Sequence, residues 1–220
     1  MKGQIRKNVK GIFFDSLCYQ CINLLIQAHQ LALEDNRYNA NWEEDTFTAH
    51  LLEYLDDLKI SGQWCINPQV SIYSKEISQG LMSPLTAPRP DIKFEKYTFQ
   101  DKKPFTYYIE AKNLSENDWQ KEIGSKVVAS SQIKRYVETG IENFINERYP
   151  TGCLAGYVVN GNIKKIVAKI NSKLAKLNRS DEYLSMIDLD TNKVGNYISK
   201  HRTASNNMLK LKHILIRFYT

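Results

Sequence analysis

The sequence is poor in cysteine: its 220 residues include four, at positions 18, 21, 65 and 153. Four scattered thiols in a chain this long exclude a disulfide framework and favour a reducing, cytoplasmic location. Cys18 and Cys21 form a C-x-x-C pair, but a four-thiolate zinc or iron–sulfur site requires a second close pair, which Cys65 and Cys153 do not provide. We therefore interpret Cys18 and Cys21 as core thiols of a helix.

A long apolar run is also lacking, because nowhere do 18 apolar residues follow one another. Asp15 and Gln20 interrupt the apolar amino-terminal stretch, and no small-residue cleavage site follows it, which argues against a signal peptide. We expect a soluble protein without a membrane-spanning segment. The hydrophobic content of 42% is sufficient for a full core, so residues 1–220 are predicted to form one domain.

Acidic residues are scarce near the carboxyl end of the sequence. Residues 163–220 hold 12 Lys and Arg against 4 Asp and Glu, a net charge of +8 in a chain whose total is +6. A basic region raises the expectation of a polyanionic partner, because Lys and Arg displace counterions from phosphates.

Apolar periodicity predicts two amino-terminal helices, over 13–35 and 42–58, with Asn41 as the N-cap of the second. Alternating apolar and polar residues predict a hairpin of two strands, 91–95 and 105–112, around the polar segment 98–104. The remaining expected elements are a strand at 68–74, a helix at 118–138, a strand at 153–161, a helix at 163–177 and a last strand in 211–220.

Three charged residues are expected to meet on this hairpin. Glu110 and Lys112 are two apart on one strand and so project from the same face, and the hairpin can bring Asp91 beside them. Two carboxylates repel each other unless a cation neutralises them, and oxygen ligands suit Mg²⁺ or Mn²⁺ better than zinc. A neighbouring lysine can position an attacking water.

Pro90, Asp91, Glu110, Ala111 and Lys112 resemble the motif of the PD-(D/E)xK nuclease superfamily. The resemblance implies a restriction-endonuclease-like α/β fold, with a central mixed sheet flanked by helices and a core order of helix, three strands, helix, strand. Residues 42–160 are predicted to have this order; the helix at 13–35 and the basic extension 163–220 are additions. The resemblance also implies that Asp91 and Glu110 bind metal and that Lys112 serves the chemical step.

The superfamily often has a glutamate on the helix before the first strand, and Glu44 is the best match because it lies on the apolar stripe of its helix. By resemblance it would be a third metal ligand and assist catalysis. The alternative is a capping box, in which Glu44 bonds back to a cap at Asn41. Glu43 is the substitute if the helical register differs by one residue.

Relatives of RecB-type exonucleases and Holliday-junction resolvases also have a Gln-x-x-x-Tyr pattern on the second helix, which Gln132 and Tyr136 match. Resemblance implies that Gln132 supports the catalytic site and that Tyr136 supports Lys112 or touches the nucleic-acid backbone. The two lie on one helical face. The alternative is an ordinary buried tyrosine next to a surface glutamine.

The helix at 163–177 keeps its lysines on the face opposite its apolar residues, and Lys165, Lys169 and Lys173 are candidates for nucleic-acid binding. A plain solvated face is the alternative. Together these features predict a Mg²⁺- or Mn²⁺-dependent deoxyribonuclease, with DNA as partner, no membrane contact, and a homodimer or partner protein left open. Two other functions stay open: a nucleic-acid-binding or assembly protein without turnover, and a ribonuclease.

Overall fold

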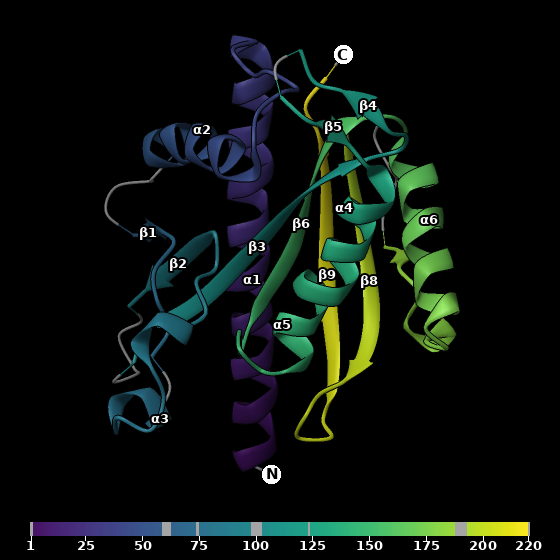
Figure 1. The fold of residues 1–220 in the computed structure, drawn as a ribbon. Helices are drawn as coiled ribbons and strands as arrows, with labels where there is room; N and C mark the ends of the chain where they lie inside the picture. Colours follow the sequence, from purple (N-terminus) through teal and green to yellow (C-terminus); the bar gives the residue numbers. More distant parts are fainter. Residues whose placement is uncertain are drawn as a thin grey trace.

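A mixed α/β architecture surrounds one large sheet in the computed structural model, which describes residues 2–58, 63–73, 75–97, 103–122, 124–187 and 193–219 (Figure 1). Seven strands form this sheet in the order β1-β2-β3-β6-β9-β8-β7. The pairs β3–β6 and β6–β9 are parallel and the other neighbours are antiparallel, so the sheet is mixed. Helices lie on both of its faces.

The strands of the main sheet are β1 (Cys65–Pro68), β2 (Ile92–Lys96), β3 (Phe105–Ser115), β6 (Gly152–Asn160), β7 (Ser185–Met186), β8 (Val194–Arg202) and β9 (Met208–Arg217). A separate two-stranded hairpin consists of β4 (Trp119–Gln120) and β5 (Lys126–Val127). The helices are α1 (Lys2–Asp35), α2 (Glu44–Asp57), α3 (Lys75–Ser78), α4 (Ala129–Arg135), the π-helical η2 (Tyr136–Ile141), α5 (Glu142–Ile145) and α6 (Ile163–Lys176), with short 3-10 helices η1 (Pro84–Thr86) and η3 (Ser180–Glu182).

Two apolar layers sandwich the sheet. On one face α1 and α2 pack on alternate residues of β3 and β6, represented by Ile109 and Ala155. On the other face the helical segment 129–145 and α6 pack on the intervening residues, represented by Tyr108 and Leu154. Alternation along each strand therefore distributes its side chains between the two layers. Figure 1 shows α1 running behind the sheet and α4, α5 and α6 in front of it.

The first helix is longer than expected, because α1 begins at Lys2 and not at residue 13. Its carboxyl-terminal part is covered by the sheet, with Leu25 and Ala28 fully buried. The segment Val9–Asp35 is long and apolar enough to cross a membrane by length and composition alone, a property that core helices of soluble proteins share. The burial of Leu25 and Ala28 against the sheet matches a core helix for this part of α1.

The strand expected at 68–74 is wrong: β1 covers Cys65–Pro68 and stops where Gln69 adopts a positive φ of 43°. Such a backbone conformation interrupts a strand. The helix expected at 118–138 begins only at Ala129, because the chain first forms the β4–β5 hairpin. The Asp118 carboxylate accepts a hydrogen bond from the backbone nitrogen of Ala129 at 2.9 Å.

The carboxyl-terminal region extends the main sheet. The last strand begins at Met208 and not near 211, and β9 pairs in parallel with β6, next to the centre of the sheet. Its neighbour β8 was not predicted from the sequence. The hairpin expected around 98–104 has its two strands in register, Ile92 opposite Ile109, while residues 98–102 lie outside the described part of the chain.

Candidate functional site

Asp91, Glu110 and Lys112 meet where β2 begins beside the middle of β3. The register that pairs Ile92 with Ile109 places Asp91 beside Glu110 on the face covered by the helical segment 129–145. The Asp91 carboxylate accepts a hydrogen bond of 2.6 Å from the backbone nitrogen of Ala111. This bond fixes the carboxylate against β3, as the hairpin prediction required.

Lys112 contacts two of the carboxylates of the cluster. Its ammonium lies 2.8 Å from Glu110 Oε1 and 3.0 Å from Glu44 Oε1, and it donates to the Ala111 carbonyl at 2.5 Å. Asp91, Glu110 and Lys112 are each only 5–6% exposed. Four ionisable groups thus share one buried site with a single formal positive charge among them.

The burial of this cluster perturbs its protonation. Burial, followed by the nearby Glu110 carboxylate, raises the pKa of Asp91 to about 7. Burial alone would lower the pKa of Lys112, but the Glu110, Glu44 and Asp91 carboxylates outweigh it and raise that pKa above its ordinary value. The lysine therefore stays charged, and the carboxylates still exceed the positive charge available to them.

Glu44 contributes from the first turn of α2 and does not form a capping box. The N-cap is Glu43 without a side-chain cap bond, so the prediction of Asn41 as cap is wrong. The Glu44 carboxylate instead reaches β3: Oε1 accepts from Lys112, and Oε2 accepts from the Asn113 backbone nitrogen at 3.2 Å. Arg135 lies 3.8 Å from Glu44 Oε2.

Glu43 points away from the cluster. Its side chain is 80% exposed and pairs with Lys121 of the segment between β4 and β5. Of the two alternatives that the sequence left open, the structure thus brings Glu44 to Lys112 and leaves Glu43 outside.

Two residues that the sequence analysis missed complete the surroundings of Glu110. The Asn143 amide donates to Glu110 Oε1 at 3.3 Å, and burial, followed by the nearby Glu110 carboxylate, raises the pKa of Tyr149. Both side chains are buried. Asn143 follows the π-helical turn η2, which changes the helical phase between Gln132 and Asn143. No local sequence pattern predicts such a turn.

Gln132 and Tyr136 do not reach Lys112. Gln132 Oε1 accepts a hydrogen bond of 2.7 Å from Ser115 Oγ, three residues beyond Lys112 on β3. Tyr136 is fully buried and its hydroxyl bonds to His213 Nδ1 of β9 at 2.9 Å. A contact between Tyr136 and a nucleic-acid backbone is wrong for this structure, because the phenol has no exposed surface.

The lysines of α6 lie apart from the cluster and contact acidic or carbonyl oxygens. Lys165 Nζ is 3.2 Å from Glu116 Oε1, Lys169 donates to the Glu116 carbonyl, and Lys173 Nζ is 2.8 Å from Glu138 Oε1. These partners partly neutralise the lysine face. A cleft of about 530 Å³ lies beside it, between α6 and the start of α4.

The acidic residues are compatible in type with a hard divalent cation, since their ligating atoms are carboxylate oxygens beside the Ala111 carbonyl. Burial, and after it the neighbouring Glu110 carboxylate, raises the pKa of Asp91, and a bound cation would favour its charged form. Among the described residues, however, no three His, Cys, Asp or Glu side chains converge closely enough to form a ready metal-binding group. In this arrangement the Lys112 ammonium lies between Glu44 and Glu110.

Comparison with known proteins found no similar protein. No family model, no curated protein and no solved structure matches the chain. Functional assignment therefore rests on the site itself.

Proposed function

We propose that the protein is a Mg²⁺- or Mn²⁺-dependent nuclease of the PD-(D/E)xK type that hydrolyses phosphodiester bonds in DNA. The observation that carries the proposal is the burial of Asp91, Glu110 and Lys112 at one point of β2 and β3 together with Glu44. Burying several charged groups disfavours folding, and apolar residues would fill the same space at lower cost. Clusters of this kind with perturbed pKa values are concentrated at functional sites.

Each residue has a distinct role in this proposal. Asp91 and Glu110 would hold the cation, and Glu44 would complete its oxygen ligands; the bound cation supplies stabilisation of negative charge on the phosphate. Lys112, bonded to Glu110, would orient the attacking water and balance its charge. Asn143 holds the Glu110 carboxylate in place through its hydrogen bond, and the Tyr149 phenol lies near that carboxylate.

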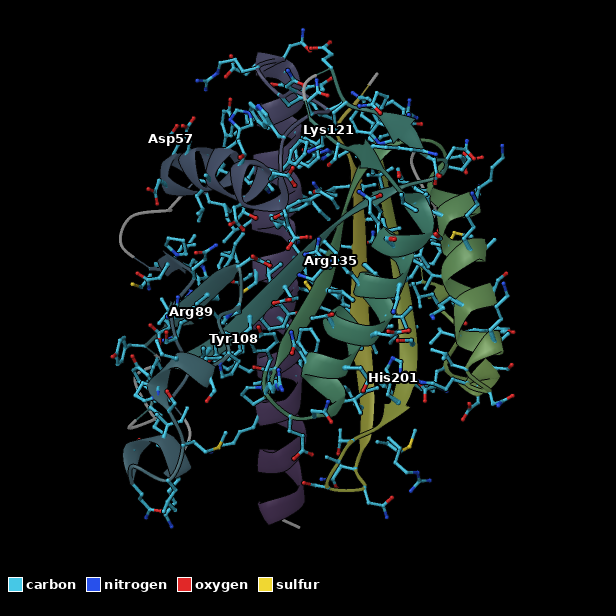
Figure 2. The ribbon with its side chains drawn as sticks, viewed as in Figure 1. Asp57, Arg89, Tyr108, Lys121, Arg135 and His201 are labelled. Carbon is cyan, nitrogen blue, oxygen red and sulfur yellow. The ribbon has the colours of Figure 1, made fainter. Side chains whose placement is uncertain are left out.

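Arg135 is the cation best placed to meet the substrate. Its side chain is 64% exposed and lies 3.8 Å from Glu44 Oε2, at the solvent side of the cluster. Figure 2 labels Arg135 near the centre of the face formed by α4 and β3. A guanidinium at this place can bind a phosphate next to the one that is cleaved.

A second candidate function is favoured by the ion pairs of Lys112. Because its ammonium already bonds to Glu110, Glu44 and the Ala111 carbonyl, the cluster can persist as a partly neutralised structural network without a metal. The protein would then bind nucleic acid or assemble with a partner without turnover. Whether the substrate is DNA or RNA is a separate matter for side-by-side cleavage of both.

Calorimetric titration with Mg²⁺ and Mn²⁺ separates these functions. The nuclease proposal predicts saturable binding that Asp91→Ala and Glu110→Ala abolish, because each removes a carboxylate from the site. Asp45→Asn, an exposed carboxylate next to Glu44 on α2, is the matched control and should bind metal like the wild type.

Metal binding that is unchanged in both Asp91→Ala and Glu110→Ala would overturn the assignment of these ligands. A wild-type protein that binds neither ion would favour the structural network and the role without turnover.

A further inference from the structure

A pocket of about 130 Å³ adjoins the proposed catalytic cluster and is not used by the chemistry described above. It lies between the start of α2, the end of β3, the β4–β5 hairpin and α4. Its volume is several times the roughly 10–15 Å³ that a cavity needs to hold one water. Six of its lining residues matter here: Trp42, Glu44, Asn113, Trp119, Gln132 and Arg135.

The pocket is continuous with the cluster through two residues. Glu44 lines the pocket and also accepts the hydrogen bond of Lys112. Asn113 follows Lys112 on β3, lines the pocket, and donates its backbone nitrogen to Glu44. A ligand in the pocket would therefore lie next to a phosphate bound at Lys112 and Arg135.

Two residues that line the pocket each carry a buried polar atom with no hydrogen-bond partner in the described part of the chain. These atoms are Oδ1 of Asn113, an acceptor, and Nε1 of Trp119, a donor; both are shielded from solvent. Buried polar atoms without partners are rare in proteins and often mark a site where another molecule supplies the bond.

The charges around the pocket favour a neutral ligand. Glu43 and Glu44 balance Lys121 and Arg135, and Lys121 is already paired with Glu43. A phosphate inside the pocket would meet the Glu44 carboxylate, whereas a planar, uncharged base would meet Trp119 and polar side chains. Aromatic residues stack on bases of any sequence because every base has a π-face.

We propose that this pocket receives one unpaired nucleobase adjacent to the phosphate bound at the Lys112 cluster. The substrate would then be a single strand, or a duplex with a base out of its stack, since a paired base cannot enter a pocket of this size. The inference rests on the proposed nuclease function, because the cluster defines where the phosphate lies. Trp119 supplies the stacking surface, and Asn113 lies with it in the lining.

The test is a fluorescence titration that does not depend on cleavage. A single-stranded oligonucleotide with one 2-aminopurine is titrated with the protein in EDTA, and the same strand in a full duplex serves for comparison. We expect binding with quenching for the single strand and weaker binding without quenching for the duplex. Trp119→Ala should bind the single strand about tenfold more weakly, within the range that one base–aromatic stack contributes.

Three further variants keep the test decisive. Trp119→Phe should retain most of the affinity, because it retains an aromatic ring. Ser125→Phe, which fills the pocket from the hairpin without removing Trp119, should lose affinity like Trp119→Ala. Lys126→Gln, on β5 but outside the pocket lining, is the control and should keep the quenching.

The proposal that the pocket binds a base would be overturned by wild-type binding without any change in fluorescence. Equal affinities of the wild type, Trp119→Ala and Ser125→Phe would also overturn it. Quenching by a protein that binds no metal and cleaves no DNA would retain the pocket and refute the nuclease. Metal-dependent cleavage with no quenching would support the nuclease and refute the base-binding pocket.

Discussion

At the scale of single residues, the molecule places its ionisable groups in two different ways. Asp91, Glu110 and Lys112 are buried together, and the Lys112 ammonium partly compensates the desolvation of the two carboxylates, which repel each other. The four histidines are instead held neutral: burial lowers the pKa of His29, His50, His201 and His213. The stability of the fold therefore depends on pH even without a catalytic role for any histidine.

His29 gives the clearest pH prediction. Burial lowers its pKa from 6.5 to about 4, and its Nε2 bonds to the Arg217 carbonyl at 2.8 Å. Between pH 6.5 and 4 the unfolded chain binds this proton and the folded chain does not, so stability is present above pH 6.5 and falls with decreasing pH. The loss is on the order of 3 kcal/mol.

Urea unfolding at pH 6.5, 5.5 and 4.5 checks this prediction. His29→Gln can keep the bond to Arg217 and does not titrate, so its free energy of unfolding should fall less steeply than that of the wild type. Parallel curves for both proteins would show that His29 contributes nothing to the acid sensitivity.

At the scale of elements, the parts of the site predicted from the sequence are those that local patterns determine. The period of two along β3 places Glu110 and Lys112 on one face, and a hairpin register adds Asp91. Asn143 and Tyr149 were missed because their positions depend on a π-helical turn and on the loop after α5. Strand β8 was missed because its pairing with β9 is a tertiary property.

The π-helical turn itself is testable through Gly140. A Cβ at this position would lie 2.9 Å from Leu154 Cδ1, so the absent side chain lets η2 approach β6 closely. Gly140→Ala should lower the free energy of unfolding by about 1–3 kcal/mol, as overpacking of a core does. Gly11→Ala in α1, where no atom lies within 4 Å, should raise it by about 0.5–1 kcal/mol.

Denaturant unfolding of both variants measures the contrast. Gly140→Ala combined with Leu154→Val should lose less than the sum of the two single losses, because the smaller residue relieves the contact. If the losses in the free energy of unfolding are additive, an alanine at position 140 does not clash with Leu154, and the close approach of η2 to β6 does not require a glycine.

At the scale of the whole molecule, the basic carboxyl-terminal region is part of the sheet that carries the site. Strand β9 lies beside β6, which in turn pairs with β3. The basic residues of α6, β8 and β9 thus belong to the same layered fold as Lys112, and Glu116 and Glu138 partly neutralise the lysines of α6. Exposed ion pairs of this kind are weak and can be exchanged for phosphates.

Replacing Lys165, Lys169 and Lys173 with Gln should weaken DNA binding at low salt. The plot of log K against log salt should become less steep by up to about 0.9 per lost phosphate contact. The control removes the same charge elsewhere, with Lys10, Lys75 and Lys103 replaced by Gln. If both triple variants have the wild-type slope, α6 is an ordinary solvated surface.

The measurement closest to the central claim is the rate of DNA cleavage with Mg²⁺, on supercoiled, linear and branched DNA, for the wild type, Asp91→Asn and Lys112→Met. The account predicts wild-type cleavage that EDTA abolishes, an inactive Asp91→Asn, and Lys112→Met slower by at least about 100-fold, the lower end for a positioned acid–base group. Absence of cleavage on every substrate, or wild-type rates in both variants, would contradict it.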